Sequence, residues 1–182
     1  MDNLIFNEYK INTKADNEII SKYKDKIPEE LMNVWIKYGF GTILNGYLKI
    51  INPDEYLKII EQSYFRANIS TPVMVTGFGD IITWEENKYI RIIKYKSGSF
   101  KGIASGFDFF WDDINTEYFC NEFFELNKYN EAIELHGHLE FDQCFGYVPL
   151  LGLGGSEKVE KLKKVKIREH IELITQLVGP IE

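Results

Sequence analysis

Hydrophobic residues recur at helical spacing in the first third of the chain. Pro28 suits the first turn of a helix, apolar side chains follow it at i, i+3, i+4 and i+7, and Gly39 offers a left-handed stop. A shorter helix is predicted to begin at an Asp16 cap and to run to Tyr23. A third helix is predicted to start at Asn52-Pro53-Asp54-Glu55, where a capping Asn, an early Pro and two acids at the positive end of the helix dipole coincide.

The middle of the chain alternates in the way that strands do. Its β-branched and aromatic runs are separated by short turn-forming gaps such as Ser97-Gly98, which predicts antiparallel hairpins. A short strand is also predicted at Tyr47–Ile51, after a Gly39-Phe40-Gly41 turn. The predicted strands of the middle are Val73–Thr76, Ile81–Trp84, Tyr89–Tyr95 and Phe100–Ala104.

Helical spacing returns after these strands. Phe119, Phe123 and Leu126 share one predicted helix face, and a second helix is predicted around Tyr129–Leu135, ending at Gly137. The order of helices, antiparallel strands and helices predicts an α+β fold, with a central antiparallel sheet flanked by helices.

The last forty residues contain one predicted strand and two predicted helical segments. Phe145–Leu153 is predicted to be a buried strand, and Ser156 is predicted to cap a helix turn that has Glu157 in its first turn. A last amphipathic helix is predicted over about Val165–Leu177, ending at Gly179-Pro180.

Negative charge is concentrated in one segment. The chain carries a formal net charge of −7, yet residues 105–145 alone hold ten acids and a single base, a net charge of −9, and each flanking region carries +1. The ten acids are Asp108, Asp112, Asp113, Glu117, Glu122, Glu125, Glu131, Glu134, Glu140 and Asp142.

Large aromatic residues lie among these acids, and Trp111 is the candidate anchor. We interpret the segment as a surface that captures a basic partner, because charge steers the encounter and buried rings supply affinity. Two alternatives stay open: the acids are the solvated face of an amphipathic helical region, and Trp111 is a core residue beneath the sheet. The predicted contact residues are Asp108, Trp111, Asp112, Asp113, Glu117, Glu122 and Glu125.

Composition narrows the class of protein. Hydrophobic content of 45% and charged content of 27% are ordinary for a soluble globular protein, and no apolar run is long enough for a membrane span. The first residues lack the pattern of a signal peptide, and two cysteines without a CxxC motif fit a reduced cytoplasm. The acidic balance argues against nucleic acid as a direct ligand. We therefore expect a cytoplasmic protein that binds neither membrane nor nucleic acid.

Candidate chemistry is sparse. His136-Gly137-His138 offers two imidazoles, but the sequence supplies no third ligand for a zinc site. His170 is expected to be a core or capping residue rather than a general base. The glycine-rich stretch Leu151–Glu157 lacks the Lys of a phosphate-binding loop, and neither cysteine has an adjacent base. The sequence therefore predicts no enzyme activity, no cofactor and no metal.

The C-terminal third, FGYVPLLGLGGSEKVEKLKKVKIREHIELITQLVGPIE, resembles the C-terminal domain of immunity proteins against type VI secretion DNase toxins. The shared features are the strand Pro149–Leu153, the turn Gly154-Gly155-Ser156 and the pair Glu169-His170 in the closing helix. The first hundred residues resemble the GAD-like domain. Within them, IPEELMNVWIKYGFG followed by GYLKIINPDEY is similar to the opening of the SMI1/KNR4 superfamily.

The resemblance implies a GAD-like domain over residues 1–104 and an immunity-protein domain over residues 105–182, packed as one unit. It also implies a non-enzymatic cytoplasmic protein that binds and silences a cognate DNase toxin. A DNase presents a basic groove to DNA, so an acidic protein can occupy that groove by imitating phosphate charge. One alternative is a regulatory interaction module of the SMI1/KNR4 type, and another is a small hydrolase or metal-dependent enzyme that uses the acids or the two histidines.

Overall fold

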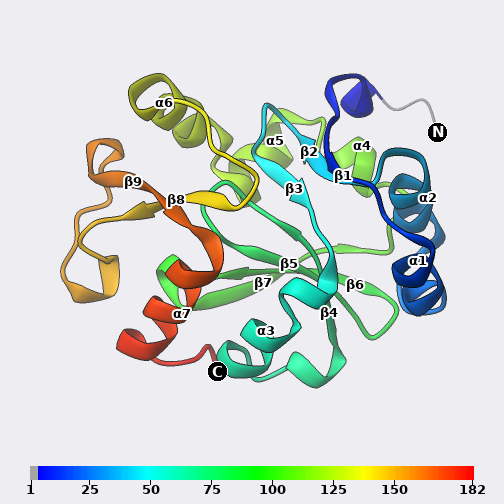
Figure 1. Cartoon of the computed structure of the whole chain (residues 1–182). Helices are drawn as coiled ribbons and strands as arrows, with labels where there is room; N and C mark the ends of the chain where they lie inside the picture. Colours follow the sequence, from blue (N-terminus) through cyan, green and yellow to red (C-terminus); the bar gives the residue numbers. More distant parts are fainter. Residues whose placement is uncertain (1–3) are drawn as a thin grey trace.

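The structure, a computed structural model that describes residues 4–182, is built around a seven-stranded antiparallel sheet (Figure 1). Each strand pairs with the next one along the chain, through short hairpins at four connections and through helical segments at the other two. The strands are β1 (Lys10–Thr13), β2 (Phe40–Ile43), β3 (Leu48–Ile50), β4 (Ser70–Val75), β5 (Ile81–Glu85), β6 (Tyr89–Lys94) and β7 (Ser99–Ser105).

The five strands β3 to β7 match the predicted strands closely, but β1 and β2, which pair across the intervening α1 and α2, were not predicted. The prediction of a turn at Gly39-Phe40-Gly41 is wrong, because Phe40 begins β2. Glycine is needed here for a different reason. A Cβ on Gly41 would lie 2.3 Å from the carbonyl oxygen of Lys10, so only glycine lets β1 approach β2 this closely.

The predicted helix start at Asp16 is confirmed by its cap, and the predicted cap at Asn52 begins a 3-10 helix, Pro53–Glu55, with the α-helix following from Leu57. The Asp16 carboxylate accepts a hydrogen bond from the Ile19 amide at 2.9 Å, and the Asn52 side chain accepts one from the Asp54 amide at 3.1 Å. Gly39 ends the second helix with a positive φ of 75°, as predicted. The α-helices are α1 (Asn17–Tyr23), α2 (Glu29–Tyr38), α3 (Leu57–Ser63), α4 (Phe110–Asp113), α5 (Glu117–Phe119), α6 (Leu126–His136) and α7 (Ile167–Val178). Short 3-10 helices occupy Leu4–Glu8, Pro53–Glu55, Ala67–Ile69, Tyr95–Ser97, Leu151–Leu153 and Val159–Lys161, and a π-helical turn occupies Cys120–Phe124.

A separate two-stranded sheet forms in the C-terminal part, from β8 (Gln143–Tyr147) and β9 (Leu162–Lys166). The predicted strand Phe145–Leu153 is therefore wrong after Tyr147, and β9 was not predicted. Ser156 does not cap a helix, because residues 155–158 have no regular structure, the 3-10 helix that follows begins at Val159, and α7 begins only at Ile167. The pairing of Tyr147 with Leu162 explains both errors, since the intervening residues form the connection of a hairpin.

Hydrophobic residues are buried on both faces of the large sheet. Ile81 and Ile82 are adjacent on β5, so their side chains point to opposite faces and enter two different clusters. The first cluster packs α2 and the aromatic residues after β7 against one face, and the second packs α3 and α7 against the other. Figure 1 shows α3 and α7 together on one side of the sheet. This arrangement is an antiparallel α+β fold, as predicted.

Candidate functional site

The segment after β7 folds into two short helices whose inner residues pack together. The buried rings of Phe110 on α4 and Phe119 on α5 contact each other, with centroids 6.0 Å apart. The residue that precedes each of these rings points outward instead. Phe109 is 72% exposed and Tyr118 is 78% exposed. Two large rings therefore stand in solvent on the segment that is richest in acids.

Local hydrogen bonds hold this irregular segment in place. The Thr116 hydroxyl accepts from the Phe119 amide at 3.3 Å and caps α5, and the Cys120 thiol donates to the Ile114 carbonyl at 3.1 Å. After the π-helical turn, Glu125 adopts a left-handed conformation with φ 53°, which separates that turn from α6. The segment is thus a defined surface, which we call the acidic aromatic surface: Asp108, Phe109, Asp112, Asp113, Glu117, Tyr118 and Glu122.

Glu125, one of the predicted contact residues, faces the protein instead. It contacts Lys96 and forms an ion pair with Lys128 at 2.9 Å, and Lys94 lies 3.8 Å away. Burial opposes ionisation of this carboxyl group, but hydrogen bonds from Lys96 and Lys128 outweigh it and lower the pKa of Glu125 to about 2. Its charge is therefore neutralised inside the molecule and adds little to an outward negative field.

The other predicted acids lie on the surface. Glu122 forms an ion pair with Lys101 at 2.7 Å, and its pKa is lowered by that hydrogen bond. Within residues 4–182, no ion pair involves Asp108, Asp113 or Glu117. Asp112 is exposed on α4 beside them. Of the predicted acids, Asp108, Asp113 and Glu117 thus carry the negative charge that remains available to a partner.

Trp111, the predicted anchor, lies in the core. Only 4% of the residue is exposed, and its ring packs against Phe6, Phe107 and Phe110 at centroid distances of 5.1, 5.5 and 5.4 Å. A buried ring with partners on three sides is held by the fold and cannot enter a partner. The structure supports the alternative that Trp111 is a core residue, and the exposed rings of this segment are Phe109 and Tyr118.

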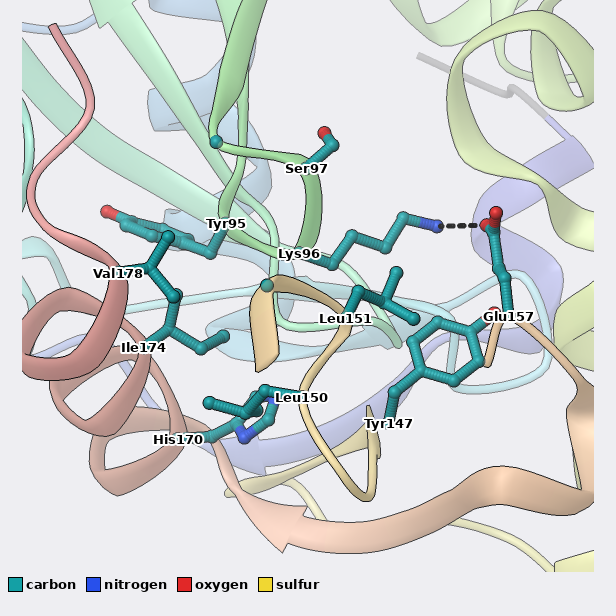
Figure 2. A pocket seen from close by; sticks show the side chains of 12 residues that line it. Tyr95, Lys96, Ser97, Tyr147, Leu150, Leu151, Glu157, His170, Ile174 and Val178 are labelled. Atoms are coloured by element: carbon teal, nitrogen blue, oxygen red, sulfur yellow. Dashed lines mark ion pairs between the residues drawn. The ribbon is translucent and has the colours of Figure 1, made fainter. Parts of the chain in front are cut away.

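A cavity of about 360 Å³ lies between the β6–β7 hairpin and the C-terminal part (Figure 2). Its walls are mainly apolar, and one edge carries Lys96 and Glu157, whose charged atoms are 4.0 Å apart. This cavity could not be predicted from local sequence patterns, because its lining comes from segments about fifty residues apart. The apolar lining residues are Tyr95, Tyr147, Leu150, Leu151, Ile174 and Val178.

The histidines and cysteines have structural surroundings. His136 Nε2 lies 2.9 Å from the Val159 carbonyl oxygen, and His170 is buried with its ring against Gly146, where a Cβ would lie only 2.5 Å from it. Burial lowers the pKa of His170 and raises the pKa values of Cys120 and Cys144. Over residues 4–182, no group of three or more His, Cys, Asp or Glu side chains is arranged to hold a metal ion. None of the helices in that range is long and apolar enough to cross a membrane.

Comparison with known proteins divides the chain into two regions. The family described as GAD-like domain matches residues 4–96, and the family described as T6SS immunity protein Tdi1, C-terminal, matches residues 104–178. A search of curated proteins found no match. Among solved structures, the chain is similar to the crystal structure of Atu4351 from Agrobacterium tumefaciens, with 18% identity, a TM-score of 0.74, and coverage of 97% of this chain and 88% of that one. At this identity the likeness shows a shared fold.

The two family matches span nearly all of the chain, and the GAD-like match alone covers half of it. The resemblance that the sequence motifs indicated is therefore confirmed. The chain belongs to the GAD-like family of type VI secretion system immunity proteins, with a C-terminal region of the Tdi1 type.

Proposed function

We propose that this protein protects the cell that makes it by binding a cognate DNase effector of the type VI secretion system through the acidic aromatic surface. Family membership supports an immunity role exercised on a protein partner. The choice of a DNase rests on charge. An enzyme that grips DNA needs a basic groove, and the outward acids of α4 and α5 offer a complementary field.

The observation that carries the proposal is the position of the two most exposed aromatic rings. Phe109 and Tyr118 exceed every other large hydrophobic residue of the described chain in exposed fraction, and both stand among the acids. Large rings left in solvent at a polar surface are typical of binding sites, where aromatic residues contribute much of the affinity. Acids around them accelerate association with a basic partner.

In this proposal the protein acts by occupying a surface of the effector and not by chemistry. The carboxylates of the surface imitate phosphate charge, and the rings displace water from the contact. The protein stays in the cytoplasm of the producing cell, where the DNA to be protected lies. It needs no cofactor, nucleic acid or membrane for this role.

The test is a binding and inhibition experiment with the effector encoded beside this gene. The purified protein is expected to inhibit DNA cleavage at a one-to-one ratio. The double variant Phe109→Ser/Tyr118→Ser is expected to raise the dissociation constant at least about tenfold, because two exposed anchors are lost and the core is untouched.

The matched control is Ile36→Ser, which removes a similarly exposed side chain (60%) from α2. It should bind the effector as wild type does. If the effector cleaves no DNA and the protein nevertheless neutralises it, the DNase part of the proposal is wrong. If the double variant binds as tightly as wild type, the binding surface lies elsewhere.

Charge is tested separately by association kinetics. Asp108→Lys/Glu117→Lys should slow association at low salt and weaken its salt dependence, because surface charges act mainly on the association rate. The control Glu131→Lys/Glu134→Lys makes the same change in net charge on exposed positions of α6. Equal slowing by both pairs would show that net charge, and not this surface, steers the encounter.

A further inference from the structure

The cavity beside the C-terminal helix is built by both regions of the chain. Tyr95–Gly98, at the end of the β6–β7 hairpin, lies at the C-terminal boundary of the GAD-like match. The Leu150–Gly152 turn and α7 lie in the C-terminal match. Its volume of about 360 Å³ falls within the range of ligand-binding pockets, roughly 300–1,000 Å³. Figure 2 shows Ile174 and Val178 projecting from α7 on the side facing Tyr95.

The cavity reaches the surface at an apolar mouth. Val178 lines the cavity and is itself 50% exposed. Leu177, its neighbour on α7, is 51% exposed, and Leu153, at the end of the turn that closes the cavity, is 56% exposed. Leu153 and Leu177 are next in sequence to the lining residues Gly152 and Val178, and exposed aliphatic residues near an opening are typical of a contact site for another molecule.

The charged residues at the edge of the cavity already pair with one another, so they do not require a charged ligand. Lys96 already contacts Glu125 and faces Glu157, and Glu157 also pairs with Lys128 at 2.9 Å. Because these charges neutralise one another, the remaining lining is mainly apolar, with Ser97 and His170 as its other polar side chains (Figure 2). An apolar group would enter without leaving a buried charge unpaired.

The exposed mouth distinguishes a polypeptide from a small molecule. A small ligand confined to the cavity would leave Leu153 and Leu177 in solvent, whereas a protein that inserts one side chain would cover them as well. The position of the cavity also suits a protein that binds the acidic aromatic surface. Lys96 connects the cavity edge to Glu125, which directly follows the turn carrying Glu122.

We propose that this cavity receives an apolar side chain, aliphatic or aromatic, from the effector protein, as a second anchor beside the acidic aromatic surface. The inference rests on the proposed function, because it names a contact of the same partner. The acids then steer the effector, and the cavity holds it once it has docked.

The test uses the nuclease-inactivated effector encoded beside this gene as the probe. Val178→Lys places a flexible cation at the mouth and should raise the dissociation constant at least about tenfold, mainly through faster dissociation. A positive charge at the end of a helix is tolerated, so the fold should survive. The matched control Leu173→Lys makes the same change at a 46% exposed position of α7 that does not line the cavity. It should change the dissociation constant less than about threefold.

Methyl NMR gives an independent measurement on the wild-type protein. Addition of the effector should shift the methyl signals of Ile174 and Val178. If wild type binds the effector but Val178→Lys binds equally well and these signals stay in place, the cavity proposal is overturned and the proposed function stands. If the wild-type protein does not bind the effector, both the cavity proposal and the proposed function are wrong. If the signals shift when the protein alone is concentrated, the cavity seats a second copy of this chain, which also overturns the proposal.

Discussion

At the residue scale, Phe109 and Trp111 show how two neighbouring rings acquire different roles. They lie two positions apart at the start of α4, yet one is 72% exposed and the other 4%. The sequence presents both as aromatic residues among acids. Which of them is buried depends on Phe6, Phe107 and Phe110, which surround Trp111 only after the chain has folded.

Trp111→Ala should destabilise the protein by about 3–5 kcal/mol, because it removes a large buried ring and leaves a cavity. Urea denaturation followed by far-UV circular dichroism measures the change. Phe109→Ala is the control, and it should stay within about 0.5 kcal/mol of wild type since the ring is in solvent. If the Trp111→Ala variant is as stable as wild type but binds the effector weakly, Trp111 is a binding residue and not a core residue.

Asp80 is a second residue whose surroundings set its chemistry. It is 1% exposed in the turn before β5, and burial raises its pKa to about 6, although Lys96 and Lys94 oppose the shift and Glu125 adds to it. The folded protein therefore binds this proton more tightly than the unfolded chain does. Asp80 consequently costs stability as pH rises from about 4 to about 6, and the cost persists above that range.

Asp80→Asn should accordingly match wild type near pH 4 and be more stable above pH 6, by about 2–3 kcal/mol. Unfolding free energies measured at several pH values between 4 and 8 check this. Glu134→Gln, at an exposed position of α6, serves as the control and should leave the pH profile unchanged. A constant difference between Asp80→Asn and wild type across the range would contradict the assignment.

At the element scale, β9 shows how an edge strand is protected. It pairs with β8 along one edge, and no other strand of residues 4–182 pairs with it along the other. Three of its five residues, Lys163, Lys164 and Lys166, are exposed lysines. Lysines on an open edge discourage pairing with another chain, because each such pairing would bring like charges together. The basic composition of this strand therefore has a structural explanation.

Lys163→Val/Lys164→Val should increase aggregation on mild heating, detected by light scattering at constant protein concentration. The variant keeps the strand propensity of β9 and removes its charge. Lys24→Val/Lys26→Val makes the same change in charge on exposed residues between α1 and α2 and should aggregate less. Equal aggregation of the two variants would assign the effect to net charge alone.

At the scale of the whole molecule, the C-terminal part is attached to the sheet of the GAD-like part. Ile167, Ile171 and Ile174 of α7 join the cluster of α3 and the sheet. The end of the chain is also held there, because the Ile181 amide donates to the Ser63 carbonyl at 2.8 Å. This packing leads us to expect that the two family regions unfold together.

Ile171→Ala tests that expectation, because all three tryptophans lie in the other hydrophobic cluster. The substitution should cost about 2–5 kcal/mol. It should move the midpoint of tryptophan fluorescence and that of circular dichroism by the same amount, as a two-state transition requires. Leu173→Ala, exposed on the same helix, should change neither midpoint appreciably. A fluorescence midpoint that stays in place would mean that the two hydrophobic clusters unfold independently.

Residues close together in the sequence determined many of the secondary-structure elements of this protein and its family motifs. The caps at Asp16 and Asn52, the stop at Gly39, the hairpins from β4 to β7 and the family motifs all depend on residues close in sequence, so their patterns could be interpreted directly. The α+β class followed from the order of these elements. The net charge of −9 in residues 105–145 was equally evident.

Contacts between distant segments decided the rest. The pairing of β1 with β2 and of β8 with β9 joins segments about thirty and twenty residues apart, and of these four strands only the region of β8 has a strand pattern from which a strand was predicted. Packing buried Trp111 and left Phe109 and Tyr118 outside. Lys128, three residues after Glu125, is a local partner, but Lys96 reaches Glu125 from the distant β6–β7 connection, and the cavity beside α7 exists only between the two regions. Local pattern specifies elements, but exposure, charge pairing and cavities belong to the folded arrangement, because each depends on which distant side chains become neighbours.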